Sequence, residues 1–179
     1  MTPRIASFLP AATEMVYLLG LEKRLVGVTH ECDHPPAARK KPVLVDCALD
    51  LSRLSMRQID RAVAARLASG KSLYSVDEAK LRKAAPTLLL TQNLCQVCGP
   101  AGNEVSQVLK TLRPAPEILW QTPQDFDQVL EAVRELGRRA GRLRTANAWI
   151  ARARARIRRL ARRAARRPKT RVSFIEWVD

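Results

Sequence analysis

Hydrophobic residues alternate along the chain between short apolar runs and longer segments with helical spacing. The short runs predict strands, because 4 to 8 apolar residues bounded by turn residues are typical of buried strands. These runs lie at 5–9, 24–28, 41–46, 86–91 and 116–120. The segments with helical spacing lie at 11–20, 55–68, 76–85 and 102–112. This order predicts an α/β fold with a mainly parallel sheet flanked by helices.

Two further helices are predicted after the last of these strands. Thr122, Pro123 and Asp125 indicate a helix start with Thr122 as N-cap, and this helix is expected to run to about residue 140 and to end at Gly141. The second helix is expected over 144–166, about 35 Å long at 1.5 Å per residue. Its apolar residues form one stripe: Leu143, Ala146, Ile150, Ala153, Ile157, Leu160 and Ala164.

The chain is expected to divide into three parts. Residues 1–121 form an α/β lobe, and residues 122–167 form bridging helices. Residues 168–179 follow Pro168 with a new apolar run, which predicts the first strand of a second lobe that is missing from this sequence.

The positive charge of the chain is concentrated in one segment. The formal net charge is +15, and residues 136–171 carry 15 Lys or Arg and no acidic residue. One interpretation is a cytosolic protein that binds nucleic acid or another polyanion through this helix. The other is a bridging helix with a solvated face. Aromatic residues make up only 4% of the chain, and no base-reading motif accompanies the arginines, so specific nucleic-acid binding is not expected.

Several segments together resemble one family. They are RIASFLPAATEMVYLLGL, LVGVTHECDHPP, PTLLLTQ, AGNEV and TRVSFIEW, beginning at residues 4, 25, 86, 101 and 170. They resemble the cobalamin-type, class III substrate-binding proteins of ABC importers, in which two α/β lobes are joined by a rigid helix. The strand, turn and helix at the start of the family match Pro10, Thr13 and Glu14. The resemblance covers nearly the whole chain and corresponds to the first lobe, the bridge and one strand of the second lobe.

The resemblance implies a binding protein for a metal chelate, delivered to the permease of an ABC importer. Cobalamin or another corrinoid is expected first, and haem or a siderophore next, with no cofactor of the protein's own. In open α/β sheets, ligands lie outside the carboxyl ends of the strands. The expected ligand-binding residues are therefore Leu9, Pro10, Thr29, His30, Glu31, Gln92, Asn93 and Cys95. Glu31 and the pair Gln92–Asn93 occupy places where cobalamin-binding members usually carry aromatic rings.

Cys95 and Cys98 form a C-x-x-C pair with three interpretations: packing in the lip of the cleft, metal ligation, or a redox pair. A structural zinc site needs four ligands, and a second C-x-x-C is missing. Only Cys32, Cys47, His30 and His34 are available to complete a set. No stoichiometric zinc is expected. His30 and Glu31 are interpreted either as part of a surface turn or as polar contacts, or an axial ligand, to a metal-centred substrate.

Glu104 has two interpretations. An acid in the first turn of a helix is favourable through the helix dipole alone. The resemblance implies a salt bridge to arginines of the permease, and the side chain is then expected to be exposed.

Enzymatic and membrane-spanning roles are not expected. The sequence contains no P-loop, dinucleotide-binding, nucleophile-elbow or H-E-x-x-H motif. No apolar run is long enough to cross a bilayer. The first residues lead into the first strand without a signal-peptide pattern, which predicts the cytoplasm for the sequence as written. A periplasmic or other extracytoplasmic location is expected if the family role holds and the true start lies upstream.

Overall fold

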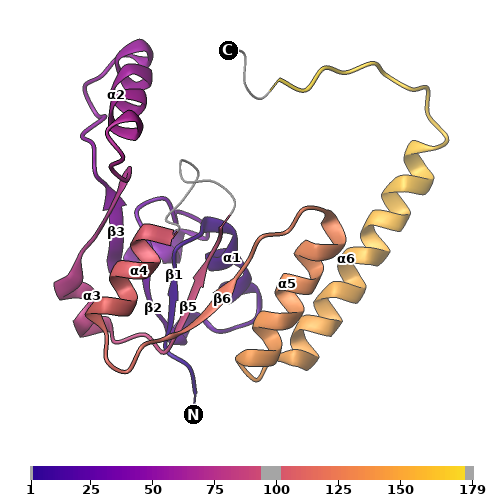
Figure 1. Ribbon diagram of the computed structural model, residues 1–179. Coiled ribbons are helices and arrows are strands. Elements are labelled where there is room, and N and C mark those ends of the chain that lie inside the picture. Colours follow the sequence, from indigo (N-terminus) through magenta and orange to yellow (C-terminus); the bar gives the residue numbers. More distant parts are fainter. Residues whose placement is uncertain (1, 94–101, 176–179) are drawn as a thin grey trace.

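The computed structural model describes residues 2–93 and 102–175, and its centre is a six-stranded sheet. The strand order is β4-β3-β2-β1-β5-β6 (Figure 1). All neighbouring strands pair in parallel except β3 and β4, which are antiparallel. The strands are β1 (Ile5–Ser7), β2 (Leu25–Thr29), β3 (Val43–Cys47), β4 (Tyr74–Val76), β5 (Leu88–Thr91) and β6 (Glu117–Trp120). The predicted α/β fold with a mainly parallel sheet is confirmed.

Helices cover both faces of the sheet (Figure 1). The α-helices are α1 (Pro10–Leu18), α2 (Met56–Ala68), α3 (Glu78–Ala84), α4 (Gly102–Thr111), α5 (Phe126–Arg139) and α6 (Leu143–Ala164). Two short 3₁₀ helices, η1 (Glu22–Arg24) and η2 (Pro36–Lys40), flank β2. Helix α2 has no fully buried residue and stands out from the end of the sheet (Figure 1).

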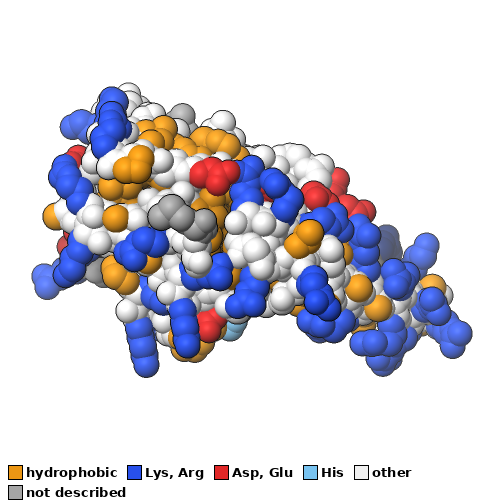
Figure 2. All heavy atoms as spheres, turned by 90° about the horizontal axis from the view of Figure 1, so that it is seen from below, with side chains coloured by type: hydrophobic (Ala, Val, Ile, Leu, Met, Phe, Trp, Pro, Cys, Tyr) orange, Lys and Arg blue, Asp and Glu red, His pale blue; other side chains and the backbone are white. Residues whose placement is uncertain are grey.

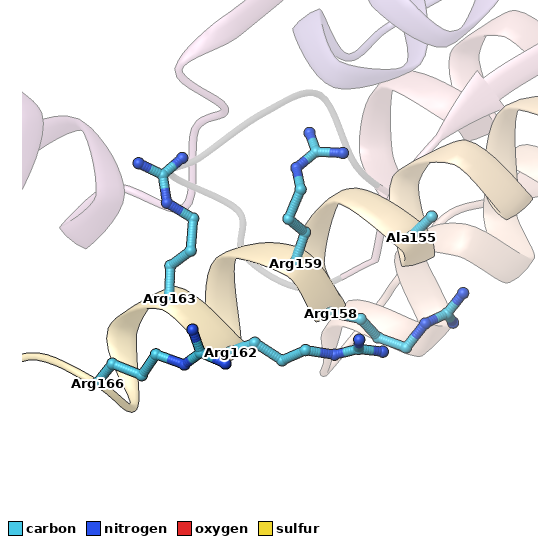
Figure 3. Close-up of a pocket in the computed structure, with 6 residues that line it drawn as sticks. All are labelled: Ala155, Arg158, Arg159, Arg162, Arg163 and Arg166. Carbon is cyan, nitrogen blue, oxygen red and sulfur yellow. The ribbon is translucent and has the colours of Figure 1, made fainter.

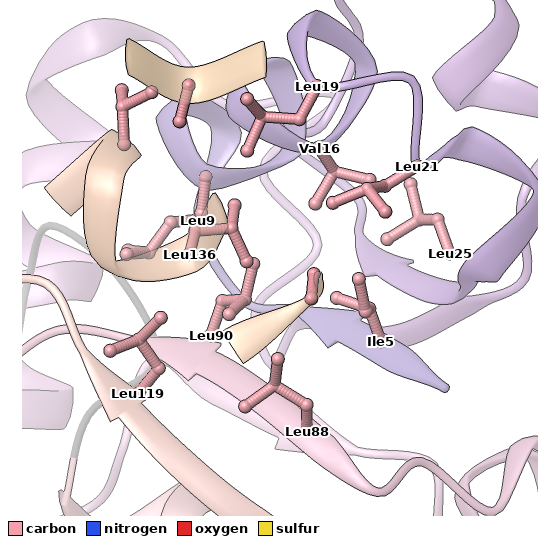
Figure 4. Packing of buried hydrophobic residues seen from close by; sticks show 14 of the residues in the cluster. Ile5, Leu9, Val16, Leu19, Leu21, Leu25, Leu88, Leu90, Leu119 and Leu136 are labelled. Carbon is pink, nitrogen blue, oxygen red and sulfur yellow. The ribbon is translucent and has the colours of Figure 1, made fainter. Parts of the chain in front are cut away.

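Alternation of side chains along the central strands builds two hydrophobic cores. Ile5, Leu88 and Leu90 face the core that includes residues of α1, α5 and α6 (Figure 4). Ala6 and Leu89 face the opposite core, which includes residues of α3 and α4. Because both faces are covered, β5 is buried along its whole length, and its sequence is a continuous apolar run rather than an alternating one.

Strand β4 was not predicted, because three residues are too short to show a periodic pattern. It forms the sheet edge by pairing Val76 with Val45 and Tyr74 with Cys47.

The helix start predicted at Thr122 is wrong. Helix α5 begins at Phe126, and the side chain of Asp125 caps it by accepting a hydrogen bond from the backbone N–H of Gln128 at 2.8 Å. Threonine and aspartate are both good N-caps. Thr122 was expected to be the cap and Asp125 to lie in the first turn, whereas Asp125 is the cap itself. The expected end at Gly141 is consistent with its φ of +68°.

Helices α5 and α6 form an antiparallel pair beside the sheet (Figure 1). A Cβ at Gly137 of α5 would lie 2.6 Å from the Cβ of Ala146 of α6, so the absence of a side chain at Gly137 allows this close contact. Arg154 of α6 donates to Asp127 of α5 at 2.9 Å. The second half of α6 extends away from the lobe (Figure 1).

Residues 168–175 form no strand and are exposed in the part of the chain that the structure describes. The strand of a second lobe therefore stays a prediction. Among the described residues, no helix has the length and apolar character needed to cross a membrane.

Candidate functional site

The carboxyl ends of the parallel strands bring the predicted binding segments to one edge of the sheet. Strands β2, β1 and β5 are neighbours, so the chain leaves them side by side after Thr29, Ser7 and Thr91. Backbone hydrogen bonds carry the ladder into the loops, from Phe8 N–H to the Leu90 carbonyl at 2.9 Å and from His30 N–H to the Val45 carbonyl at 3.1 Å. We call this edge the rim.

Five of the predicted residues present surface at the rim. His30, Glu31 and Asn93 are exposed, and Pro10 and Gln92 are partly exposed. They come from the segments that follow three neighbouring strands.

The side chains of two other predicted residues do not reach the surface. Leu9 is 7% exposed and packs in the core beside Leu136 (Figure 4). Thr29 is 1% exposed, and its hydroxyl accepts from the backbone N–H of Glu31 at 3.3 Å. Both side chains therefore pack beneath the rim and are not exposed to a ligand.

His30 has the most structured surroundings of the rim residues. Its Nδ1 lies 3.7 Å from a carboxylate oxygen of Asp46, and its side chain is 31% exposed. Its ring lies 6.3 Å from the ring of Tyr74, at an interplanar angle of 45°. These contacts limit how the imidazole can turn and leave part of it accessible.

Cys32, predicted as a possible metal ligand at the rim, is buried instead. It is 2% exposed, its Sγ accepts from the hydroxyl of Thr13 at 3.1 Å, and the hydroxyl of Thr29 lies 3.4 Å away. The turn after β2 folds this side chain back toward α1, whereas His30 points to the surface. Among the described residues, no three His, Cys, Asp or Glu side chains are grouped to hold a metal ion. Cys95 and Cys98 lie outside the described residues, so their role stays open.

A cavity of about 440 Å³ lies beside His30 at the carboxyl ends of β2 and β3. We call it the α2 cavity, because α2 and the loop before it supply much of its wall. Its lining residues are His30, Glu31, Cys47, Leu49, Asp50, Leu51, Ser52, Val63, Leu73 and Tyr74.

Gln121 is a rim residue that sequence reasoning missed. It follows β6, and its backbone N–H donates to the Thr91 carbonyl at 2.7 Å. Its side chain is 5% exposed, and its Nε2 has no hydrogen-bond partner among the described residues. A polar residue directly after a buried strand was the available signal.

Glu104 was expected to be exposed, and this is wrong. It is 5% exposed, and its carboxylate accepts a hydrogen bond from the hydroxyl of Ser72. The segment that leads into β4 lies against the start of α4 and covers the acid. A partner arginine would have to displace at least Ser72 to reach it.

The arginines of α6 form a separate charged surface (Figure 2). Among the described residues, the hollow on this helix is lined by side chains of α6 and of Arg166 just after it: Ala155, Arg158, Arg159, Arg162, Arg163 and Arg166. Arg159 and Arg163 point to one side, whereas Arg158, Arg162 and Arg166 lie along another (Figure 3). Because no second element among residues 2–93 and 102–175 closes this hollow, it is an open helix surface in the described part of the chain.

Comparisons with known proteins agree on the fold. The sequence model of the family described as "Periplasmic binding protein" matches residues 5–179. A possible iron-binding periplasmic solute-binding protein of Staphylococcus epidermidis is similar in structure, with a TM-score of 0.65, 19% identity, and coverage of 94% of this chain and 54% of that one.

Two other solved structures have similar scores. The periplasmic vitamin B12-binding protein of Vibrio cholerae has a TM-score of 0.57 and 18% identity, and the match covers 92% of this chain and 51% of that one. The periplasmic haem-binding protein of Roseiflexus sp. RS-1 has a TM-score of 0.60 and 20% identity, covering 91% and 51%.

The chain spans about half the length of these solved structures, with 54%, 51% and 51% of each covered. No curated protein sequence matches it significantly.

Proposed function

Because the chain belongs to the periplasmic binding protein family, we propose that it forms the first lobe of a substrate-binding protein for a metal chelate. The observation that supports this most directly is the rim, where exposed or partly exposed polar side chains follow β2 and β5, and partly exposed Pro10 follows β1 between them. Imidazole and carboxylate groups such as His30 and Glu31 are ligands or polar contacts suited to a metal-centred molecule. Similar solved structures include iron-, vitamin B12- and haem-binding proteins, which supports the ligand class.

A corrinoid such as cobalamin is the first candidate ligand. The periphery of the corrin ring carries neutral carboxamides, which can form hydrogen bonds with the carboxamides of Gln92 and Asn93. Haem and many siderophores carry carboxylates or other anionic groups, which Glu31 would repel. Haem and iron siderophores are therefore second.

Replacing His30 and Glu31 together by alanine tests this proposal. The chain is titrated with cyanocobalamin, haemin and a ferric siderophore, and binding is followed by calorimetry and visible absorbance. Weak binding of cyanocobalamin is expected. The double replacement is expected to weaken it about tenfold, the effect of losing about 1.4 kcal/mol of polar contact.

His34→Ala is the matched control, because His34 is an exposed histidine of the same loop and is not a predicted contact. It is expected to leave the affinity unchanged. The proposal fails if none of the three chelates binds at high micromolar concentration, or if His34→Ala weakens binding as much as the double replacement does.

Delivery to an ABC importer and an extracytoplasmic location are part of the same proposal, since they follow from the family role. Glu104 no longer supports the docking step as first expected, because its carboxylate is covered by Ser72.

A polyanion-binding role through α6 is the second candidate function. The exposed arginines of the α6 surface favour it, because guanidinium groups suit phosphates. Binding of duplex DNA that is selective for sequence or structure, and stronger than binding to heparin, would favour this role over a chelate-binding one.

A further inference from the structure

The α2 cavity has an apolar wall built from three different segments. Leu49 and Leu51 come from the loop after β3, Val63 comes from α2, and Leu73 lies directly before β4. Tyr74, 9% exposed, adds an aromatic surface. A volume of about 440 Å³ falls within the range of about 300–1,000 Å³ found for sites that bind small molecules.

The polar residues of the cavity are acidic or neutral. Glu31 and Asp50 are the charged groups among the lining residues that the structure describes, and Lys and Arg are absent from that lining. Arg66, on the same helix as Val63, is held elsewhere, because its Nε donates to the Ser72 carbonyl at 2.5 Å.

Two neighbouring groups keep the cavity negative. Asp46 lies 3.7 Å from His30 and offsets any positive charge on the imidazole. Hydrogen bonds from the hydroxyl and the backbone N–H of Ser52 lower the pKa of Asp50, so this carboxyl stays ionised at neutral pH.

We propose that the α2 cavity binds a compact aromatic molecule that carries a positively charged amine. The ring packs against Leu49, Val63 and Leu73, and the ammonium group reaches the carboxylates of Glu31 and Asp50. Tyr74 and His30 form a tilted aromatic pair at 6.3 Å, and the tyrosine face is a favourable neighbour for a cation.

This site goes beyond the proposed chelate site and does not depend on it. His30 and Glu31 belong to both, so filling the cavity is expected to change the affinity of the rim for its own ligand. The two sites nevertheless differ in the chemistry they select, because the cavity excludes anions and is too small for a whole corrin and its substituents.

Tryptamine and indole-3-acetate test the proposal, because they share a ring and carry opposite charges. Each is titrated into the 179-residue chain while backbone amide shifts are recorded by NMR. Tryptamine is expected to shift the amides of Leu49, Val63 and Leu73, and to bind about tenfold more tightly than indole-3-acetate, as one favourable charge contact near the surface would give. Equal affinities, or shifts confined to other parts of the chain, would overturn the proposal.

Val63→Trp fills the cavity and is expected to abolish tryptamine binding. Ala65→Trp is the matched control, because Ala65 lies on the exposed face of the same helix. Far-UV circular dichroism checks that both variants fold.

The double replacement Glu31→Gln with Asp50→Asn provides a second test that leaves the volume of the cavity unchanged. It is expected to remove the preference for tryptamine over indole-3-acetate, and a preference that survives it would contradict the proposal. If tryptamine binds and cyanocobalamin does not, the chelate proposal fails while this one stands.

Discussion

Gly27 lies in the middle of β2 at a point where no side chain fits. A Cβ there would lie 2.2 Å from Cδ1 of Leu44, and Leu44 is fully buried on the neighbouring strand. Gly27→Ala is therefore expected to destabilise the fold by about 1–3 kcal/mol, the usual cost of overpacking a core. Urea unfolding followed by circular dichroism measures this change.

Gly102→Ala is the control for this replacement, because no atom of the described residues lies within 4 Å of a Cβ at that position. The double variant Gly27→Ala with Leu44→Val is expected to recover part of the loss, since the shorter side chain yields space. A Gly27→Ala protein as stable as the unchanged chain would show that β2 and β3 are not packed as described.

The position of a residue was predictable where a parallel strand ends and unpredictable where distant segments meet. His30 and Glu31 lie at the rim as expected, because the residues after a parallel strand are placed by topology. Their contact with a ligand stays a prediction. Glu104 and Cys32 were misplaced because their burial depends on partners far away in sequence. Ser72, which covers Glu104, is 32 residues away, and Thr13, which donates to Cys32, is 19 residues away.

At the scale of elements, helix caps carry part of the pH dependence of stability. Asp77 caps α3 by accepting from the backbone N–H of Lys80 at 2.9 Å, and this hydrogen bond lowers the pKa of Asp77. A pKa that is lower in the folded than in the unfolded state stabilises the fold above the unfolded value. That contribution is lost as the pH falls through the folded value.

Asp77→Asn isolates this contribution, because asparagine is also a good N-cap and does not titrate. Unfolding by urea is compared for the two proteins between about pH 7 and pH 2, a range that spans the unfolded Asp pKa of about 3.9. The unchanged chain is expected to be more stable near neutral pH, with the difference shrinking toward pH 2. A difference that stays constant with pH would contradict a lowered pKa for Asp77.

The contact between α5 and α6 depends on the absence of a side chain at Gly137. Besides Ala146, the backbone carbonyl of Arg142 lies 3.2 Å from the position of a Cβ there. Gly137→Ala is expected to separate the two helices and to lower stability by about 1–3 kcal/mol, despite the better helix propensity of alanine. Thermal unfolding measures this change, with Gly102→Ala again as the control. A more stable Gly137→Ala protein would mean that the helices already have room between them.

Elements with a long periodic pattern were predictable, and short or competing ones were not. The apolar stripe predicted helix 144–166, and α6 spans Leu143–Ala164. Strand β4 forms by pairing Tyr74–Val76 with β3, and the local sequence pattern does not predict this pairing. Thr122 and Asp125 compete as caps for one helix, and the choice depends on where α5 packs.

At the scale of the whole molecule, one lobe and a projecting helix account for the described residues. The apolar stripe of α6 is buried at Ala146 and Ile150, whereas Ile157 and Leu160 are 43% and 49% exposed. In a two-lobed protein, the second lobe would cover that exposed part. The division of the chain at 121 and 167 and the second-lobe strand at 168–179 remain predictions, because residues 168–175 form no strand in the part of the chain that the structure describes.

The proposed chelate site lies at the rim and not on the α6 surface. The most direct test is an NMR titration of the isotopically labelled chain with cyanocobalamin, because it locates even weak binding on individual residues. Amide shifts are expected to concentrate at His30, Glu31, Gln92 and Asn93 and to leave α6 unchanged. Shifts confined to the arginines of α6, or no shifts at high micromolar ligand, would contradict this proposal.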